Sequence, residues 1–170
     1  MPSLALEKLA TIVRTQGGPL RLYALGFLAG LESSPADDVV QEAFIKLARQ
    51  TPTPDDPTAW LYRVVRHAAL SARRGAVRRR KHEAEAAGER GAWFQPTADS
   101  RLDAAEAAAA LERLDELLRE TVVAHLWGGL TFEQIGALSG TSSSTAYRRY
   151  EEGLRELRKH WKQPCRNTNG

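Results

Sequence analysis

The chain has 170 residues, of which 42% are hydrophobic and 26% are charged, as in an ordinary soluble globular protein. No apolar run approaches the ~20 residues of a membrane span, and the start lacks a signal-peptide layout, so we expect no membrane insertion. The only cysteine, Cys165, excludes a disulfide framework and favours a reducing, cytoplasmic location. The histidines lack metal-site spacing, and no phosphate loop or nucleophile motif occurs. We therefore expect no enzyme: no catalytic residue, no metal and no cofactor.

Charge is unevenly distributed, although the net charge is only +3. Eight cations with no acid among them lie between residues 60 and 82: Arg63, Arg66, Arg73, Arg74, Arg78, Arg79, Arg80 and Lys81. The segment from residue 83 to residue 116 contains nine acidic residues and only three arginines. A basic block followed by an acidic one predicts an anionic partner for the first and a linker role for part of the second.

Helical periodicity dominates the N-terminal part, and no stretch alternates like a strand. Apolar spacing predicts helices over residues 4–15 and 19–30, separated by the breaker Gly17-Gly18-Pro19. The next helix is predicted to start at Ser34, as a hydroxyl cap, followed by Pro35 at the first helical position. Its apolar stripe is Val39, Val40, Ala43, Phe44 and Leu47, and its polar face is Asp37, Asp38, Gln41 and Glu42. That polar face is either simply exposed or a docking face for a partner.

A long helix is predicted over residues 57–85, with Asp56 as cap and Pro57 as its first residue. Its apolar stripe is Leu61, Val64, Val65, Ala68 and Ala72, with Arg63, Arg66, Arg73, Arg74 and Lys81 on the opposite side. A cationic side without acids favours nucleic-acid phosphate as its target. An anionic membrane surface and a solvated basic face are the alternatives.

The C-terminal part is predicted to hold an alanine-rich helix over 102–118, a helix over 120–127 and then a helix-turn-helix. Thr131 and Gln134 match a capping box, Gly140 suits the left-handed residue that ends a helix, and Ser142 suits an N-cap. The buried face of the last helix is predicted to be Ala146, Tyr150, Leu154, Leu157 and Trp161, and its outer face Ser144, Thr145, Arg148, Arg155 and Lys159, with Arg149 on the flank. Hydroxyls and arginines on an outer face suit a DNA major groove. A plain helical hairpin with solvated arginines fits this segment equally well.

Three motifs in this order resemble the extracytoplasmic-function sigma factors of the bacterial sigma-70 family. They are "ADDVVQEAF" (36–44), "AWLYRVVRHAAL" (59–70) and "GGLTFEQIGALSGTSSSTAYRRYEEGLREL" (128–157), and the resemblance spans residues 20–157. It implies an all-α fold of two small domains joined by a flexible linker, the C-terminal one a helix-turn-helix. The corresponding boundaries are 1–86 for a region 2-like domain, 87–101 for the linker, 102–163 for a region 4-like domain and 164–170 for a polar tail.

The resemblance also implies a role for each motif in transcription initiation. Core RNA polymerase would be bound, at its clamp coiled coil, by Asp37, Asp38, Gln41, Glu42 and Phe44, and its flap would be a second contact. The promoter −10 element would be bound by Trp60, Arg63, Arg66, His67, Arg73 and Arg74. The −35 element would be bound by Ser142, Ser143, Ser144, Thr145, Tyr147, Arg148 and Arg149. Whether an anti-sigma factor also binds is left open.

Two other classes of protein remain as alternatives. A stand-alone helix-turn-helix regulator that binds duplex DNA as a dimer would account for the C-terminal half but not for the acidic face of residues 37–42. A helical adaptor without a nucleic-acid role would leave both arginine clusters without a purpose. Promoter-specific transcription with core polymerase distinguishes the sigma factor from both.

Overall fold

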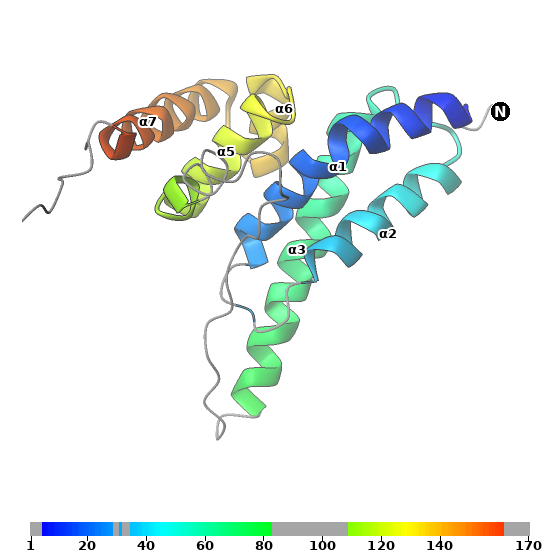
Figure 1. Cartoon of the computed structure of the whole chain (residues 1–170), viewed down its shortest axis with the longest axis horizontal. Coiled ribbons are helices and arrows are strands. Elements are labelled where there is room, and N and C mark those ends of the chain that lie inside the picture. The colour runs from blue at the N-terminus through cyan, green and yellow to red at the C-terminus, as the bar shows by residue number, and fades with distance from the viewer. Residues whose placement is uncertain (1–4, 29–30, 32–34, 83–108, 162–170) are drawn as a thin grey trace, which may run out of the picture.

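The computed structural model describes residues 5–28, 31, 35–82 and 109–161 (Figure 1). Several sequence predictions lie outside these residues: the cap at Ser34, the linker at 87–101, the start of the alanine-rich helix and the polar tail at 164–170. Within the described residues every regular element is a helix. This confirms the predicted all-α class.

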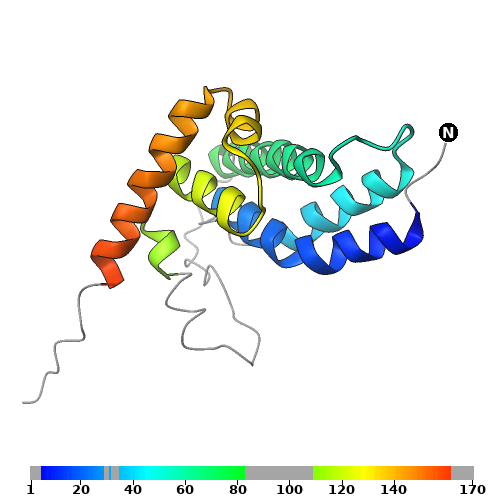
Figure 2. The ribbon, with the colours of Figure 1, turned by 90° about the horizontal axis from the view of Figure 1, so that it is seen from above.

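The helices form two groups that pack against each other (Figures 1 and 2). The elements are α1 (Leu6–Leu28), α2 (Ala36–Arg49), α3 (Pro57–His82), α5 (Glu116–Leu126), α6 (Phe132–Ser139) and α7 (Ser143–Trp161). Helices α1, α2 and α3 contact one another, as do α5, α6 and α7. Helix α1 also packs against α5, so the two groups share one continuous set of buried side chains.

Helix α1 is continuous through Pro19, so the predicted break between two N-terminal helices is wrong. A proline inside a helix removes one backbone hydrogen bond and costs about 3 kcal/mol. The following turns bury Leu20, Tyr23 and Phe27, each at most 3% exposed. Burial of large apolar side chains contributes about 1.5–3 kcal/mol apiece, which outweighs the lost bond.

The predicted helix over 102–118 is also wrong at its C-terminal end. Residues 109–112 are helical, but the chain then turns, and α5 begins only at Glu116. Asp115 causes this restart, because its carboxylate accepts a hydrogen bond from the Leu117 amide at 3.0 Å and caps α5. The buried Leu111 and Leu114 anchor the turn on the core.

Helix α3 begins as predicted, with the Asp56 carboxylate accepting from the Ala59 amide at 2.9 Å. Beyond the buried Pro57 at its start, its buried residues are Leu61, Tyr62, Val65 and Ala69, each 0% exposed, whereas the predicted Val64, Ala68 and Ala72 are half-buried. Tyr62 and Ala69 extend the buried stripe, and the ring of Tyr62 lies 4.8 Å from that of Tyr23 on α1. The part of the chain described for α3 therefore packs on more than one side.

Candidate nucleic-acid interface

Helices α6 and α7 form the predicted helix-turn-helix, and its caps are confirmed. The Thr131 hydroxyl accepts from the Gln134 amide at 3.2 Å, and the Gln134 side chain accepts from the Thr131 amide at 2.9 Å. Gly140 has a φ of 70°, the left-handed conformation that glycine adopts without strain. The Ser142 hydroxyl accepts from the Thr145 amide at 3.1 Å and so caps α7.

The turn lies unusually close to α6, at a glycine that the sequence reasoning missed. A Cβ atom on Gly136 would lie 2.8 Å from the carbonyl oxygen of Thr141, a distance that a side chain cannot tolerate. That carbonyl belongs to the turn, and the Thr141 amide donates to the Gly136 carbonyl at 2.8 Å. The sequence signal that could have indicated this close approach was a glycine in the middle of a short predicted helix.

The predicted −35 residues lie together at the N-terminal end of α7. Ser142, Ser144, Tyr147 and Arg148 are exposed, whereas Ser143, Thr145 and Arg149 are half-buried. The predicted inner face is confirmed for the buried Ala146 and Leu157 and the half-buried Tyr150 and Leu154, while the side chain of Trp161 is outside the described set. The exposed hydroxyls and guanidinium therefore share one outward surface, and their contact with DNA stays a prediction.

Tyr147 is oriented on this surface by an acid one turn further along α7. Its hydroxyl donates to a carboxylate oxygen of Glu151 at 2.8 Å, and this bond raises the pKa of the tyrosine. The Tyr147 ring also meets the ring of Phe132 edge to face, with centroids 5.3 Å apart. Behind it, His125 stacks on Phe132, and the Nδ1–H of its ring donates to the Leu130 carbonyl at 2.7 Å.

The predicted −10 residues on α3 do not all face solvent. Arg63, His67 and Arg74 are exposed and Trp60 is half-buried. Arg66 and Arg73, however, turn toward α5, which corrects the expectation that all the arginines lie on an open side. Arg66 Nε lies 2.7 Å from a carboxylate oxygen of Glu120, and Arg73 forms an ion pair with Glu116.

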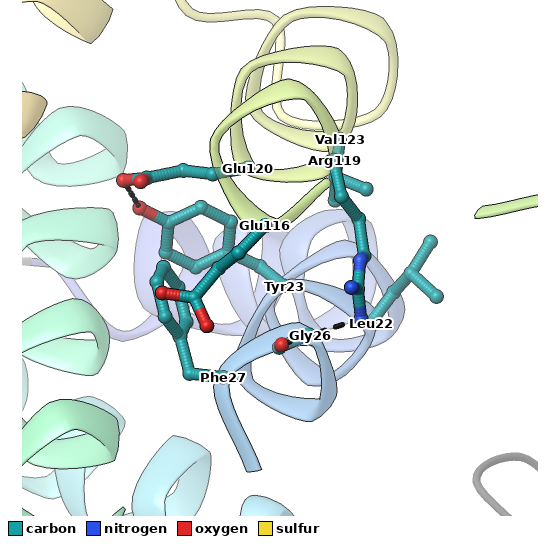
Figure 3. A pocket seen from close by; sticks show the side chains of 8 residues that line it. All are labelled: Leu22, Tyr23, Gly26, Phe27, Glu116, Arg119, Glu120 and Val123. Atoms are coloured by element: carbon teal, nitrogen blue, oxygen red, sulfur yellow. Dashed lines mark hydrogen bonds between the residues drawn. The ribbon is translucent and has the colours of Figure 1, made fainter. Parts of the chain in front are cut away.

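Glu120 is the buried centre of this contact, with a side chain only 2% exposed. It accepts from the Tyr23 hydroxyl at 2.9 Å (Figure 3). It also accepts from Nε of Arg66 at 2.7 Å. Burial, and then the charge of Glu120, raise the pKa of Tyr23 well above its usual 10.0. Burial alone would lower the pKa of Arg66, but its hydrogen bond and charge pairing with Glu120 outweigh this and raise it. Both groups therefore hold their protons firmly.

Arg119 borders the same contact, beside a small cavity of about 10 Å³ between α1 and α5 (Figure 3). Its guanidinium donates to the Gly26 carbonyl of α1 at 3.4 Å and to the Leu114 carbonyl at 3.0 Å. Burial lowers the pKa of Arg119. A further polar contact joins the two groups elsewhere: Nε2 of the Gln134 side chain donates to a carboxylate oxygen of Asp56 at 2.6 Å.

The predicted polymerase-binding residues lie along α2, beside a groove that sequence reasoning did not predict. Asp37, Asp38, Gln41 and Glu42 are exposed, and Phe44 is half-buried. The groove, of about 470 Å³, runs between α1 and α2 and is lined by Leu9, Val13, Val40, Gln41, Phe44 and Ile45 among others. Asp37 borders it and pairs with Arg21 of α1 at 2.6 Å. The sequence signal that could have indicated this groove was the set of apolar residues at the start of the first helix, such as Leu9 and Val13.

Among the described residues, no group of three or more histidine, cysteine or acidic side chains is arranged to hold a metal ion. None of the helices in that part of the chain combines the length and the apolar character that crossing a membrane requires.

The fold defines a class of small all-helical protein in which a three-helix group packs against a helix-turn-helix group. The family model for sigma-70 region 2 matches residues 13–79, which cover most of α1 and nearly all of α2 and α3. The ECF RNA polymerase sigma factor SigE of Mycolicibacterium smegmatis is 31% identical over 145 residues, which cover 81% of this chain and 56% of that protein. The chain thus spans little more than half the length of that relative.

Two solved structures share the fold. The sigma factor RpoE of Bartonella quintana, in complex with the anti-sigma factor NepR, matches with a TM-score of 0.70 at 21% identity, over 91% of this chain and 96% of that one. CnrH, in complex with the cytosolic domain of CnrY, matches with a TM-score of 0.55 at 24% identity, over 90% and 86% of the two chains. Residues 13–79 thus match sigma-70 region 2, and most of the chain is similar in sequence to an extracytoplasmic-function sigma factor.

Proposed function

We propose that this protein is a sigma factor that binds core RNA polymerase in the cytoplasm and directs promoter recognition, DNA opening and transcription initiation. The observation that carries the proposal is the pairing of a sigma-70 region 2 match on α1–α3 with a capped helix-turn-helix on α6 and α7. The protein would act as a non-enzymatic subunit, with residues 1–86 and 102–163 as its two promoter-binding domains.

Polymerase docking is assigned to α2 and the groove beside it. The exposed Asp38, Gln41 and Glu42 offer acceptors and an amide, while Phe44 and its apolar neighbours offer a surface for a partner helix. A helix laid against an apolar groove and rimmed by charge is the arrangement expected of the clamp coiled coil. The flap would contact the helix-turn-helix group.

DNA binding is assigned to the outer faces of α3 and α7. Arg63 and Arg74 are exposed, so they can meet phosphates directly, and Arg66 and Arg73 add two more donors once they leave α5. Opening DNA costs about 1.4 kcal/mol per base-pair step on average, and binding of the displaced strand offsets this cost. On α7, Arg148 can form a bidentate pair with guanine while the serine hydroxyls hold phosphates.

The test is transcription from genomic fragments by core polymerase reconstituted with the full chain. We expect promoter-specific transcripts and co-elution with core, both lost in Asp38→Arg. The matched control is Asp55→Arg, which makes the same charge change at another exposed acid, in the loop before α3. Tight binding to a palindromic duplex without polymerase, and no transcript from any fragment, would instead support the stand-alone regulator, which no observation here favours.

A further inference from the structure

The acidic face of α5 covers part of the cationic face of α3. Glu116 and Glu120 lie one helical turn apart on α5, and each is paired with an arginine of α3. The Arg66 side chain is only 20% exposed, compared with 36% for Arg73. Two of the guanidinium groups that a −10 strand would contact are therefore already satisfied inside the chain.

Carboxylates and DNA phosphates compete for the same guanidinium N–H groups, because both accept charge-assisted hydrogen bonds. Glu120 also accepts from Tyr23, and it is almost fully buried, so a phosphate cannot reach Arg66 while α5 stays in place. Nearby, a Cβ atom on Gly128 would lie 2.6 Å from the Tyr62 ring, which shows how closely the two groups approach.

We propose that α5 is an intramolecular competitor for single-stranded DNA on the α3 surface. This inference rests on the proposed function, because it takes the α3 arginines as the −10 contact. In the closed chain Arg66 and Arg73 donate to Glu120 and Glu116, and when the groups separate the same donors pass to the phosphates of the displaced strand. Arg63 and Arg74 stay exposed in the closed chain and make the first contact.

The test changes only the acids, because the arginines belong to both complexes. The double variant Glu116→Gln, Glu120→Gln keeps hydrogen-bonding side chains but removes two charges. The control, Glu112→Gln with Glu133→Gln, makes the same charge change at two exposed acids outside the contact. The probe is a fluorescein-labelled oligothymidylate about 20 nucleotides long, which reports sequence-independent single-strand binding.

We expect the double variant to bind the probe on the order of tenfold more tightly than the control, as loss of two charge-assisted bonds predicts. Energy transfer between dyes at Arg14→Cys on α1 and Arg158→Cys on α7, in a Cys165→Ser background, should fall in the same variant. Equal affinity in the two variants, absence of probe binding in both, or unchanged energy transfer would each overturn the competition. Failure of the wild-type chain to direct transcription with core polymerase would instead overturn the proposed function.

A second inference comes independently from the outer surface of α7, and it too rests on the proposed function. Glu151 is exposed, and it lies three, four and seven residues after Arg148, Tyr147 and Ser144, so all four side chains share one face. A carboxylate on a groove-facing surface is repelled by phosphates unless it meets a base donor. The amino group of cytosine is the donor that glutamate pairs with in the major groove.

We infer that Glu151 selects cytosine at one position of the −35 element, with Tyr147 as a positioning residue. The Tyr147 hydroxyl, 2.8 Å from a Glu151 oxygen, fixes the carboxylate on the exposed face and leaves its other oxygen to accept from the base. A guanine at that position would present only acceptors to the carboxylate, so it would be rejected.

The readout is the base preference of the holoenzyme on a promoter library randomised across the −35 element. We expect Glu151→Ala to lose the cytosine preference at one position, Tyr147→Phe to weaken it, and Glu152→Ala, about 100° further round the helix, to keep it. Retention of every preference by Glu151→Ala, or a uniform change at all positions, would overturn this assignment. Absence of any enrichment by the wild-type holoenzyme would overturn the proposed function itself.

Discussion

Arg148 is the α7 side chain that we propose to contact a base of the −35 element. It is exposed, and one of its terminal nitrogens lies 3.5 Å from the Thr145 hydroxyl, so the guanidinium starts from the outer face of the helix. We expect Arg148→Ala to change which −35 sequences are used, with a discrimination loss of about 1–3 kcal/mol at one base pair.

The measurement for Arg148 is a comparison of transcription from promoters that differ at single −35 positions. The control is Arg155→Ala, which removes another exposed arginine two turns further along α7. An equal loss on every promoter would show that Arg148 holds only a phosphate.

Tyr23 should make the free energy of unfolding fall at alkaline pH. Burial and Glu120 hold the Tyr23 pKa well above 10.0, and burial raises the pKa of Tyr62 as well. In the unfolded chain both phenols lose their protons near pH 10, while the folded chain keeps them, so the folded state binds more protons. The free energy of unfolding should therefore be unaffected by these groups below pH 10 and fall above it, by about 1.4 kcal/mol per pH unit for each tyrosine.

Urea unfolding followed by circular dichroism between neutral pH and pH values above 10 tests this dependence. Tyr23→Phe should lower the stability at neutral pH, because Glu120 loses a donor, but should make the alkaline decline shallower. Tyr147→Phe, on the exposed surface of α7, should leave the decline nearly as steep as in the wild type. A wild-type stability that is constant across the alkaline range would contradict the prediction.

At the scale of the element, local signals predicted most boundaries. Caps at Asp56, Thr131, Gly140 and Ser142 depend on side chains and conformations within a few residues, so the sequence carries them directly. The failures have a different origin. Pro19 does not break α1 because burial against other helices offsets its cost, and that burial is a tertiary effect. Asp115 restarts a helix inside a run that periodicity alone would continue.

Gly136 is the element-scale feature that determines whether α6 and α7 keep their angle. In Gly136→Ala the new Cβ would meet the backbone of Thr141 and Ser142 at 2.8 and 3.0 Å, and backbone cannot move aside as a side chain can. We expect a loss of about 1–3 kcal/mol from overpacking, reduced but not cancelled by the better helix propensity of alanine. Transcription that depends on the −35 element should fall in parallel.

Thermal unfolding and transcription from a promoter with an intact −35 element measure the two effects. The control for stability is Gly17→Ala in α1, where a Cβ meets nothing within 4 Å and the next residue is not a proline. That variant should gain about 0.5–1 kcal/mol. Comparable stability of the two variants would show that the turn can shift without loss.

At the scale of the whole molecule, the sequence could place the arginines on one side of α3 but could not say what that side contacts. Helical periodicity gives directions around one axis, whereas the pairing of Arg66 with Glu120 joins residues 54 positions apart. Glu116 was the last member of the acidic stretch predicted beside the linker, and Glu120 was only the first residue of the next predicted helix. Only the packing of α1 against α5, together with the two ion pairs from α3, shows that they face the basic helix.

The exposed and the covered arginines of α3 should therefore differ in how they contribute to promoter binding. Arg63 and Arg74 are exposed and form no ion pair with any acid of the described residues. Each phosphate contact that they make should therefore release counterions without displacing one of those acids. We expect Arg63→Ala with Arg74→Ala to reduce the slope of log affinity against log salt by about 0.7–0.9 per contact. The slope is measured for the holoenzyme on one promoter across a range of salt concentrations.

The matched control for this slope is Arg14→Ala with Arg49→Ala, which removes two exposed charges from α1 and α2. Because these side chains lie away from the surface assigned to DNA, that variant should keep the wild-type slope. A slope that is unchanged in the α3 variant, or equally reduced in both, would mean that the exposed face of α3 is not what holds the promoter. A reduction confined to the α3 variant would fix the side of the molecule along which the DNA runs.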